Sequence, residues 1–69
     1  MVLTKMERLT LYGIAYGLSH KQISGVLRVS PNTTKTHTKR VFRKLGVNNA
    51  CQAVVTGFRC RVLDINDFH

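Results

Sequence analysis

Apolar side chains recur every three or four positions in four stretches of this chain, and residues that favour helix starts or stops bound the stretches. This spacing is typical of amphipathic α-helices, because a helix advances about 100° per residue and side chains three or four positions apart share a face. We therefore expect an all-α fold, a small four-helix bundle whose helices cover roughly residues 4–17, 19–27, 31–45 and 49–60.

The first two predicted helices both begin with a capping box. In this motif the hydroxyl of the N-cap residue accepts a hydrogen bond from the backbone N–H three residues later, and the glutamate or glutamine side chain at that later position accepts one from the backbone N–H of the N-cap residue. Thr4 pairs with Glu7 in this way, and Ser19 pairs with Gln22. Gly17 supplies the stop between the two helices, because glycine favours the left-handed conformation that ends many helices.

The third predicted helix carries the clearest functional pattern. Ser30 is a good N-cap, and Pro31 suits the first helical position, where its missing N–H is not needed. In projection the helix has a neutral side, with Thr34, Thr38, Val41 and Leu45, and an opposite side with Thr36, Lys39 and Arg43, flanked by Lys35 and Arg40. No acid lies on it. Such a helix attracts a polyanion, and the major groove of duplex DNA is wide enough to admit it.

A short turn at Arg28-Val29 joins the second and third helices. Two helices joined in this way form a helix-turn-helix motif, in which the second helix enters the DNA groove and the first crosses the backbone. The fourth helix has a wide apolar arc around Val54, Val55 and Phe58, with Cys51 at its edge. Two interpretations of this arc stay open: all of it packs on the core, or part of it meets a second copy of the chain.

The charge balance supports a polyanionic partner. Eleven Lys and Arg side chains face three acids, for a formal net charge of +8, and two of the acids, Asp64 and Asp67, lie near the end of the chain. Phosphate neutralisation is the commonest use of such an excess. A merely solvated basic surface is the weaker interpretation. A membrane-surface helix is disfavoured, because no strongly apolar face backs the basic residues.

Sixty-nine residues suit one small domain over residues 1–69. We expect its core within 3–60, and we expect the tail, 61–69, to fray because it has no clear periodicity. No apolar run approaches the roughly 20 residues that span a bilayer, and the first residues do not form a signal peptide. The sequence therefore predicts a cytoplasmic protein without a membrane partner.

Catalysis and ligand binding are not expected. The chain has no nucleophile beside a base, no phosphate loop and no spacing typical of metal ligands. Cys51 and Cys60 lie half a turn out of phase on one predicted helix and too far apart for a disulfide, so free thiols are expected. We predict no enzymatic activity, no cofactor, no metal and no small-molecule ligand.

Two groups of residues form a specific pattern. The first comprises Leu3-Thr4, Glu7, Gly17-Leu18-Ser19, Lys21, Ile23 and Leu27. The second comprises Ser30, Thr33, Lys35, His37, Val41, Lys44-Leu45-Gly46-Val47 and Ala53-Val54. In order and spacing these residues resemble the LuxR-type (LuxR/GerE) helix-turn-helix family. The resemblance covers about Leu3 to Phe58, which is nearly the whole chain.

The resemblance implies a bacterial DNA-binding domain that regulates transcription, with the third helix in the major groove of double-stranded DNA. By position, Lys35, Thr36 and Lys39 correspond to residues that read base edges. The positions that face the DNA backbone are Lys21, Thr33 and Arg43, to which we add the flanking Arg40. In the family the fourth helix often pairs in a dimer, so a homodimer on a two-fold symmetric site would use Cys51, Val55 and Phe58. His37 is expected to be packed and hydrogen-bonded.

The chain departs from the family pattern in two ways. The family usually has apolar residues where this chain has Thr10, Gly13 and Thr34, and Gly13 and Thr34 are expected to thin the core. The family has charged residues at the positions of Met6, Leu9 and Ala50, so we expect this chain to lack some internal polar interactions that the family has.

The outer face of the first helix instead carries Leu9, Tyr12 and Tyr16. Two interpretations are open: a docking surface for another protein or a second subunit, or a rearranged core that absorbs these side chains. The docking surface would suit an interaction module that titrates another regulator, which is the alternative to a DNA-binding regulator. The cations on the third helix favour the DNA-binding regulator. Both a stand-alone regulator and one domain of a longer regulator are compatible with the sequence.

Overall fold

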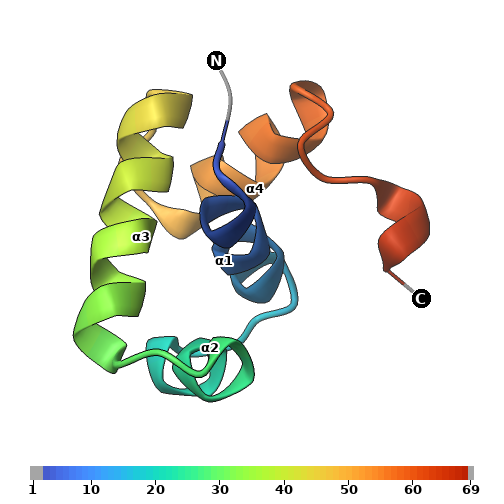
Figure 1. Ribbon diagram of the computed structural model, residues 1–69. Helices are drawn as coiled ribbons and strands as arrows, with labels where there is room; N and C mark the ends of the chain where they lie inside the picture. The colour runs from blue at the N-terminus through green and yellow to red at the C-terminus, as the bar shows by residue number, and fades with distance from the viewer. Residues whose placement is uncertain (1–2, 69) are drawn as a thin grey trace.

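The computed structural model describes residues 3–68 and places four α-helices there. They are α1 (Lys5–Ala15), α2 (His20–Leu27), α3 (Pro31–Leu45) and α4 (Ala50–Arg59), and a short 3-10 helix, η1 (Ile65–Asp67), follows. The all-α fold predicted from the sequence is confirmed. Figure 1 shows α1 between α3 on one side and α4 on the other, with α2 across their lower end.

Local capping signals set the helix starts. Thr4 Oγ1 accepts a hydrogen bond from the Glu7 N–H at 3.2 Å, and the Thr4 N–H donates to Glu7 Oε1 at 2.9 Å. Ser19 and Gln22 make the same reciprocal pair at the start of α2. Both predicted capping boxes are therefore present. α1 ends two residues before the predicted boundary, because Gly17 already adopts a left-handed φ of 83°.

The turn between α2 and α3 forms the predicted helix-turn-helix. Arg28 closes α2 in the left-handed conformation, with φ at 59°, and Ser30 then caps α3. A hydrogen bond of 2.6 Å between Ser24 Oγ and Thr34 Oγ1 joins the two helices in the interior. The motif is thus fixed by a buried polar contact as well as by its turn.

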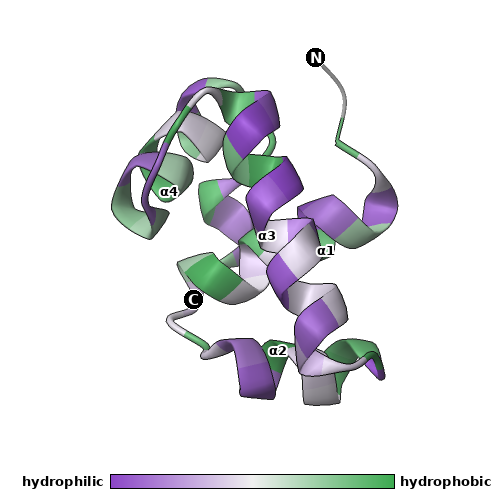
Figure 2. Cartoon of the chain, turned by 90° about the vertical axis from the view of Figure 1, so that its left-hand side faces the viewer, coloured by the Kyte–Doolittle hydropathy of each residue, from purple (hydrophilic) through white to green (hydrophobic). Residues whose placement is uncertain are grey.

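The core lies where α1, α3 and α4 meet. Leu11, Val41 and Ala53, one from each helix, are fully buried, and Leu63 from the tail joins them. α3 separates this core from solvent, and Figure 2 shows mostly hydrophilic or neutral residues along its outer side. In the part of the chain that the structure describes, no helix has both the length and the apolar character needed to cross a membrane.

The expectation of a thinner core was wrong. Thr10 is fully buried, and its hydroxyl donates to the carbonyl of Met6 at 2.8 Å. Thr34 is also fully buried and is satisfied by Ser24. At Gly13 a Cβ atom would lie 2.7 Å from Cγ1 of Ile23. Glycine therefore lets α1 and α2 approach closely, so it does not leave a void.

The expectation that the tail frays does not match its described part, residues 61–68. The side chain of Leu63 is only 3% exposed, and Phe68 packs against the core cluster. The segment lacks helical periodicity because Leu63 and Phe68 are covered through separate tertiary contacts, while Ile65 stays exposed. The packed domain therefore extends beyond residue 60.

Candidate nucleic-acid interface

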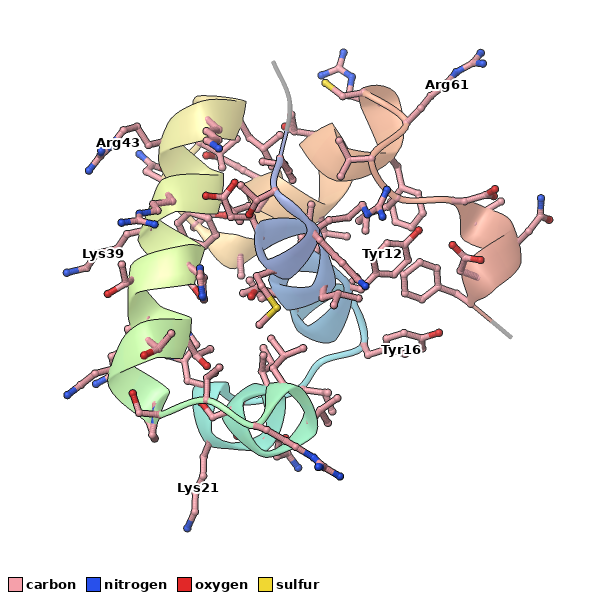
Figure 3. All side chains as sticks on the ribbon, viewed as in Figure 1. Tyr12, Tyr16, Lys21, Lys39, Arg43 and Arg61 are labelled. Carbon is pink, nitrogen blue, oxygen red and sulfur yellow. The ribbon has the colours of Figure 1, made fainter. Side chains whose placement is uncertain are left out.

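The outer side of α3 is a continuous exposed surface of cations and a hydroxyl. The structure places Thr34, Thr38 and Val41 in the interior. It leaves exposed all five residues predicted for the opposite side and its flanks: Lys35, Thr36, Lys39, Arg40 and Arg43. Figure 3 shows Lys39 and Arg43 projecting away from the domain. The two sides deduced from the helical projection are thus the two sides of the folded helix.

The first turn of α3 is held by its own hydroxyls. Ser30 Oγ accepts from the Thr33 N–H at 3.2 Å and lies 2.9 Å from Thr33 Oγ1. Thr36 Oγ1 donates to the carbonyl of Asn32 at 3.1 Å. Since this bond satisfies the donor of the Thr36 hydroxyl, its methyl group is the part best suited to an outward apolar contact.

Lys21 adds a cation from α2. It is exposed and, in Figure 3, points away from the lower end of the domain. Within the described chain, the ion pair that forms is Glu7 with Lys44. Among residues 3–68 the predicted DNA-facing cations of α2 and α3 therefore have no acidic partner, and their charge is available for an external anion.

Glu7 and Lys44 form an ion pair that was not predicted from the sequence. Lys44 Nζ lies 2.7 Å from Glu7 Oε1, which also accepts from the Thr4 N–H. The Lys44 ammonium, followed by the Thr4 N–H, lowers the pKa of Glu7 despite the burial of this carboxyl. The chain's one acid outside the tail is thus neutralised internally, on α1 and away from the outer side of α3.

The other two acids lie in the tail, on the far side of the domain from α3 (Figure 1). The Tyr12 hydroxyl donates to Asp67 Oδ2 at 2.5 Å, and the Tyr16 hydroxyl donates to the carbonyl of Asp67. The hydrogen bond to the Asp67 carboxylate raises the pKa of Tyr12. No acid of the described chain therefore lies on the outer side of α3.

These contacts bear on both interpretations of the outer face of α1. The ring of Phe68 lies 5.6 Å from that of Tyr12 and 4.6 Å from that of Tyr16, between ring centroids. Tyr12 is half-buried and packs against the core cluster, as the second interpretation expected, whereas Tyr16 touches Phe68 but stays 56% exposed. Leu9 stays 38% exposed. The structure therefore does not match a docking surface that requires both tyrosine side chains to be fully exposed.

His37 differs from its expectation in one respect. Its ring is partly buried, as predicted, but its Nδ1 atom is buried without a hydrogen-bond partner. Its neighbours on the helix, Thr36 and Thr38, bond to backbone carbonyls of the preceding turn. The ring therefore packs without the hydrogen bond that was expected at Nδ1.

The candidate dimer surface on α4 is only partly available. Cys51 is exposed and Val55 is 52% exposed, whereas Phe58 packs on the core cluster, with its ring 5.6 Å from that of Phe68. Both cysteines are free thiols. Across residues 3–68, His, Cys, Asp and Glu side chains do not gather in threes as metal ligands would.

The comparisons with known proteins agree with this arrangement. The family described as "Bacterial regulatory proteins, luxR family" matches residues 1–56. A probable transcriptional regulatory protein NarL of Mycobacterium tuberculosis is 44% identical over 63 residues, covering 91% of this chain and 29% of that protein. The nitrate/nitrite response regulator protein NarP of Escherichia coli is 43% identical over 54 residues, covering 78% of this chain and 25% of that protein.

A solved structure gives the same result. The crystal structure of the response regulator ChrA from a heme-sensing two-component system superimposes with a TM-score of 0.86 and 32% identity, over 91% of this chain and 31% of that one. The chain thus spans only about a quarter to a third of the length of these proteins. The resemblance seen in the sequence is confirmed: this chain belongs to the luxR family of bacterial regulatory proteins.

Proposed function

We propose that this chain is a sequence-specific DNA-binding unit of a bacterial transcriptional regulator, with α3 in the major groove. The observation that carries the proposal is the outer side of α3, which is exposed, cationic and free of acids over its whole length. The relatives support it, since they are named as transcriptional regulatory proteins. In this proposal the domain binds DNA and catalyses no reaction, and it acts in the cytoplasm.

In this proposal Lys35, Thr36 and Lys39 read base edges. Lysine suits the O6 and N7 acceptors of guanine, and the methyl group of threonine suits the methyl group of thymine. The three side chains lie within about one helical turn of the exposed side, which matches the few base pairs that one recognition helix reads.

A second set of residues neutralises phosphates and positions the helix. It comprises Lys21, Thr33, Arg40 and Arg43. Their contacts are largely independent of sequence and make the affinity depend on salt. Lys21 on α2 would contact phosphates on one side of the DNA groove, and Arg43, near the end of α3, would contact phosphates on the other side.

The unit binds as a homodimer through α4 on a two-fold symmetric site. Half-sites would then lie about one helical turn, or 10 bp, apart. The exposed Cys51 and Val55 would meet the second copy. Phe58 would support that surface from within, because it packs on the core.

Two variants separate base reading from electrostatics. Binding to a selected duplex and to a scrambled duplex would be measured by fluorescence anisotropy over a range of salt. Lys39→Ala should relax discrimination between the two duplexes, whereas Lys21→Ala should weaken binding to both and lower the salt slope by about one unit. Arg59→Ala, which removes an exposed cation from α4, is the matched control. Equal loss on both duplexes for Lys39→Ala would refute its role as a base reader.

A further inference from the structure

An apolar groove lies between α1 and α2. Its volume is about 170 Å³. Its walls are formed by Leu9, Tyr12, Tyr16, Leu18, Val26 and Leu27. In Figure 3 Tyr16 points away from Lys39 and Arg43. The α1–α2 groove therefore lies apart from the cationic side of α3, and the proposed contact with DNA makes no use of it.

The floor of the groove is closed. Gly13 and Ile23 line it, and the two helices touch there so closely that a Cβ atom on Gly13 would meet Ile23 at 2.7 Å. The groove is therefore a surface feature above a tight helix contact and does not lead into the core. A side chain can enter it only from outside.

Three large apolar side chains on the groove are exposed: Val26 by 71%, Tyr16 by 56% and Leu9 by 38%. Single exposed apolar residues are normal on protein surfaces, but a contiguous patch marks an interaction site more often than chance. The tail strengthens one wall, because Asp67 and Phe68 hold the two tyrosines in place. A wall that is already ordered loses little side-chain entropy when it is covered.

The rim of the groove is mainly cationic. Lys5 and Arg8 are exposed on the same face of α1 as Leu9, and Arg8 lines the adjoining hollow with Leu9 and the two tyrosines. Arg28, also exposed, directly follows the wall residue Leu27. Among the described acids, Asp67 lines that hollow and accepts a hydrogen bond from Tyr12, and Asp64 also lies beside Tyr12. The charge therefore favours an acidic occupant.

We propose that the α1–α2 groove binds an acidic segment of a partner protein, with one large apolar side chain of that segment inserted in the groove. The apolar anchor would supply most of the affinity, as buried anchors do at other interfaces. Acidic residues beside the anchor would pair with Lys5 and Arg8. Because the groove faces away from α3, the segment and a DNA duplex can be bound at once. This inference does not depend on the proposed DNA-binding function.

The test uses a labelled synthetic peptide of about four helical turns, with leucine along one face and glutamate elsewhere. Its binding to the chain would be followed by fluorescence anisotropy and by amide shifts in NMR spectra. Val26→Ser should weaken binding about tenfold, and Arg8→Gln by about twofold to fivefold. Each has a matched control away from the groove, Ile65→Ser in the tail and Arg59→Gln on α4, which should bind as the parent chain does. All four positions are exposed, so the fold is retained.

Several results would overturn the proposal. One is no binding of the peptide, and another is equal binding of a peptide whose leucines are replaced by serine. Loss in Lys39→Gln rather than in Arg8→Gln would place the peptide on the DNA-facing side of α3. Self-association that disappears in Val26→Ser, measured by sedimentation, would assign the groove to a second copy of the chain. DNA affinity measured on the same variants is independent, so failure of this inference is distinguishable from failure of the proposed function.

Discussion

Glu7 on α1 and Lys44 on α3 form an ion pair with 2.7 Å between Oε1 and Nζ, although 37 positions separate them in the chain. The side chain of Glu7 is 3% exposed and that of Lys44 is 35% exposed. The pair connects the capped start of the first helix to the last turn of the DNA-facing helix. It therefore adds a polar link between α1 and α3 to the apolar core cluster that contains Leu11 and Val41.

Glu7→Gln tests this tie. Glutamine preserves the capping box but removes the negative charge. We expect the free energy of unfolding in urea to fall by about 1–2 kcal/mol, because one charge-assisted hydrogen bond becomes neutral while the exposed part of Lys44 remains screened by solvent. A double-mutant cycle with Lys44→Met isolates the pair. A coupling energy near zero would show that the pair adds nothing to stability.

The same pair predicts a pH dependence. Lys44 and the Thr4 N–H lower the pKa of Glu7 below its ordinary value of about 4.5. For a carboxyl whose pKa is lower in the folded state, the added stability is fully present above the ordinary pKa and is lost as the pH falls through the folded pKa. The stability difference between the parent chain and Glu7→Gln should therefore shrink as the pH falls below about 4.5. A difference that grows under acid would contradict this account.

The tail contributes to stability through Phe68, which contacts the rings of Tyr12, Tyr16 and Phe58. Phe68→Ala should lower the free energy of unfolding by about 1–3 kcal/mol, because it removes this cluster while leaving the helices intact. Ile65→Ala is the matched control, since Ile65 lies in the same tail but is 67% exposed. If both changes had the same small effect, the tail would not be part of the packed domain.

Two glycines inside helices should respond to alanine with opposite signs. At Gly25 nothing lies within 4 Å of an added Cβ atom, so Gly25→Ala should stabilise the chain by about 0.5–1 kcal/mol through helix propensity. At Gly13 the Cβ atom would meet Cγ1 of Ile23 at 2.7 Å, and Gly13→Ala should destabilise it by about 1–3 kcal/mol. Thermal unfolding of the two variants measures both effects. Stabilisation by both would mean that α1 and α2 are not in close contact.

Local signals explain why the sequence predicted the DNA-facing helix so well. Ser30 and Pro31 mark its start, and Gly46, with φ at 70°, marks its end. These signals lie within or beside the helix, and the predicted bounds of α3 agree with the structure. The same holds for which residues of α3 are buried, because helical geometry alone determines the two sides.

Contacts between distant residues were not predictable in this way. Tyr12 and Asp67 are 55 positions apart, and no local pattern links them. Thr34 was expected to thin the core, yet its hydroxyl lies 2.6 Å from that of Ser24, ten positions earlier in the chain. The tail had no periodicity, so its buried Leu63 gave no signal. Side-chain partners of this kind depend on how the helices pack, which the sequence pattern does not specify.

The central claim is that α3 reads DNA sequence, and selection from a pool of random duplexes at near-physiological salt tests it most directly. The retained duplexes would be sequenced. We expect a symmetric enriched motif whose half-sites lie about 10 bp apart, and we expect Lys39→Ala to lose that enrichment. Retention of duplexes without any enriched motif would contradict the claim, because the cations of α3 would then provide only electrostatic attraction.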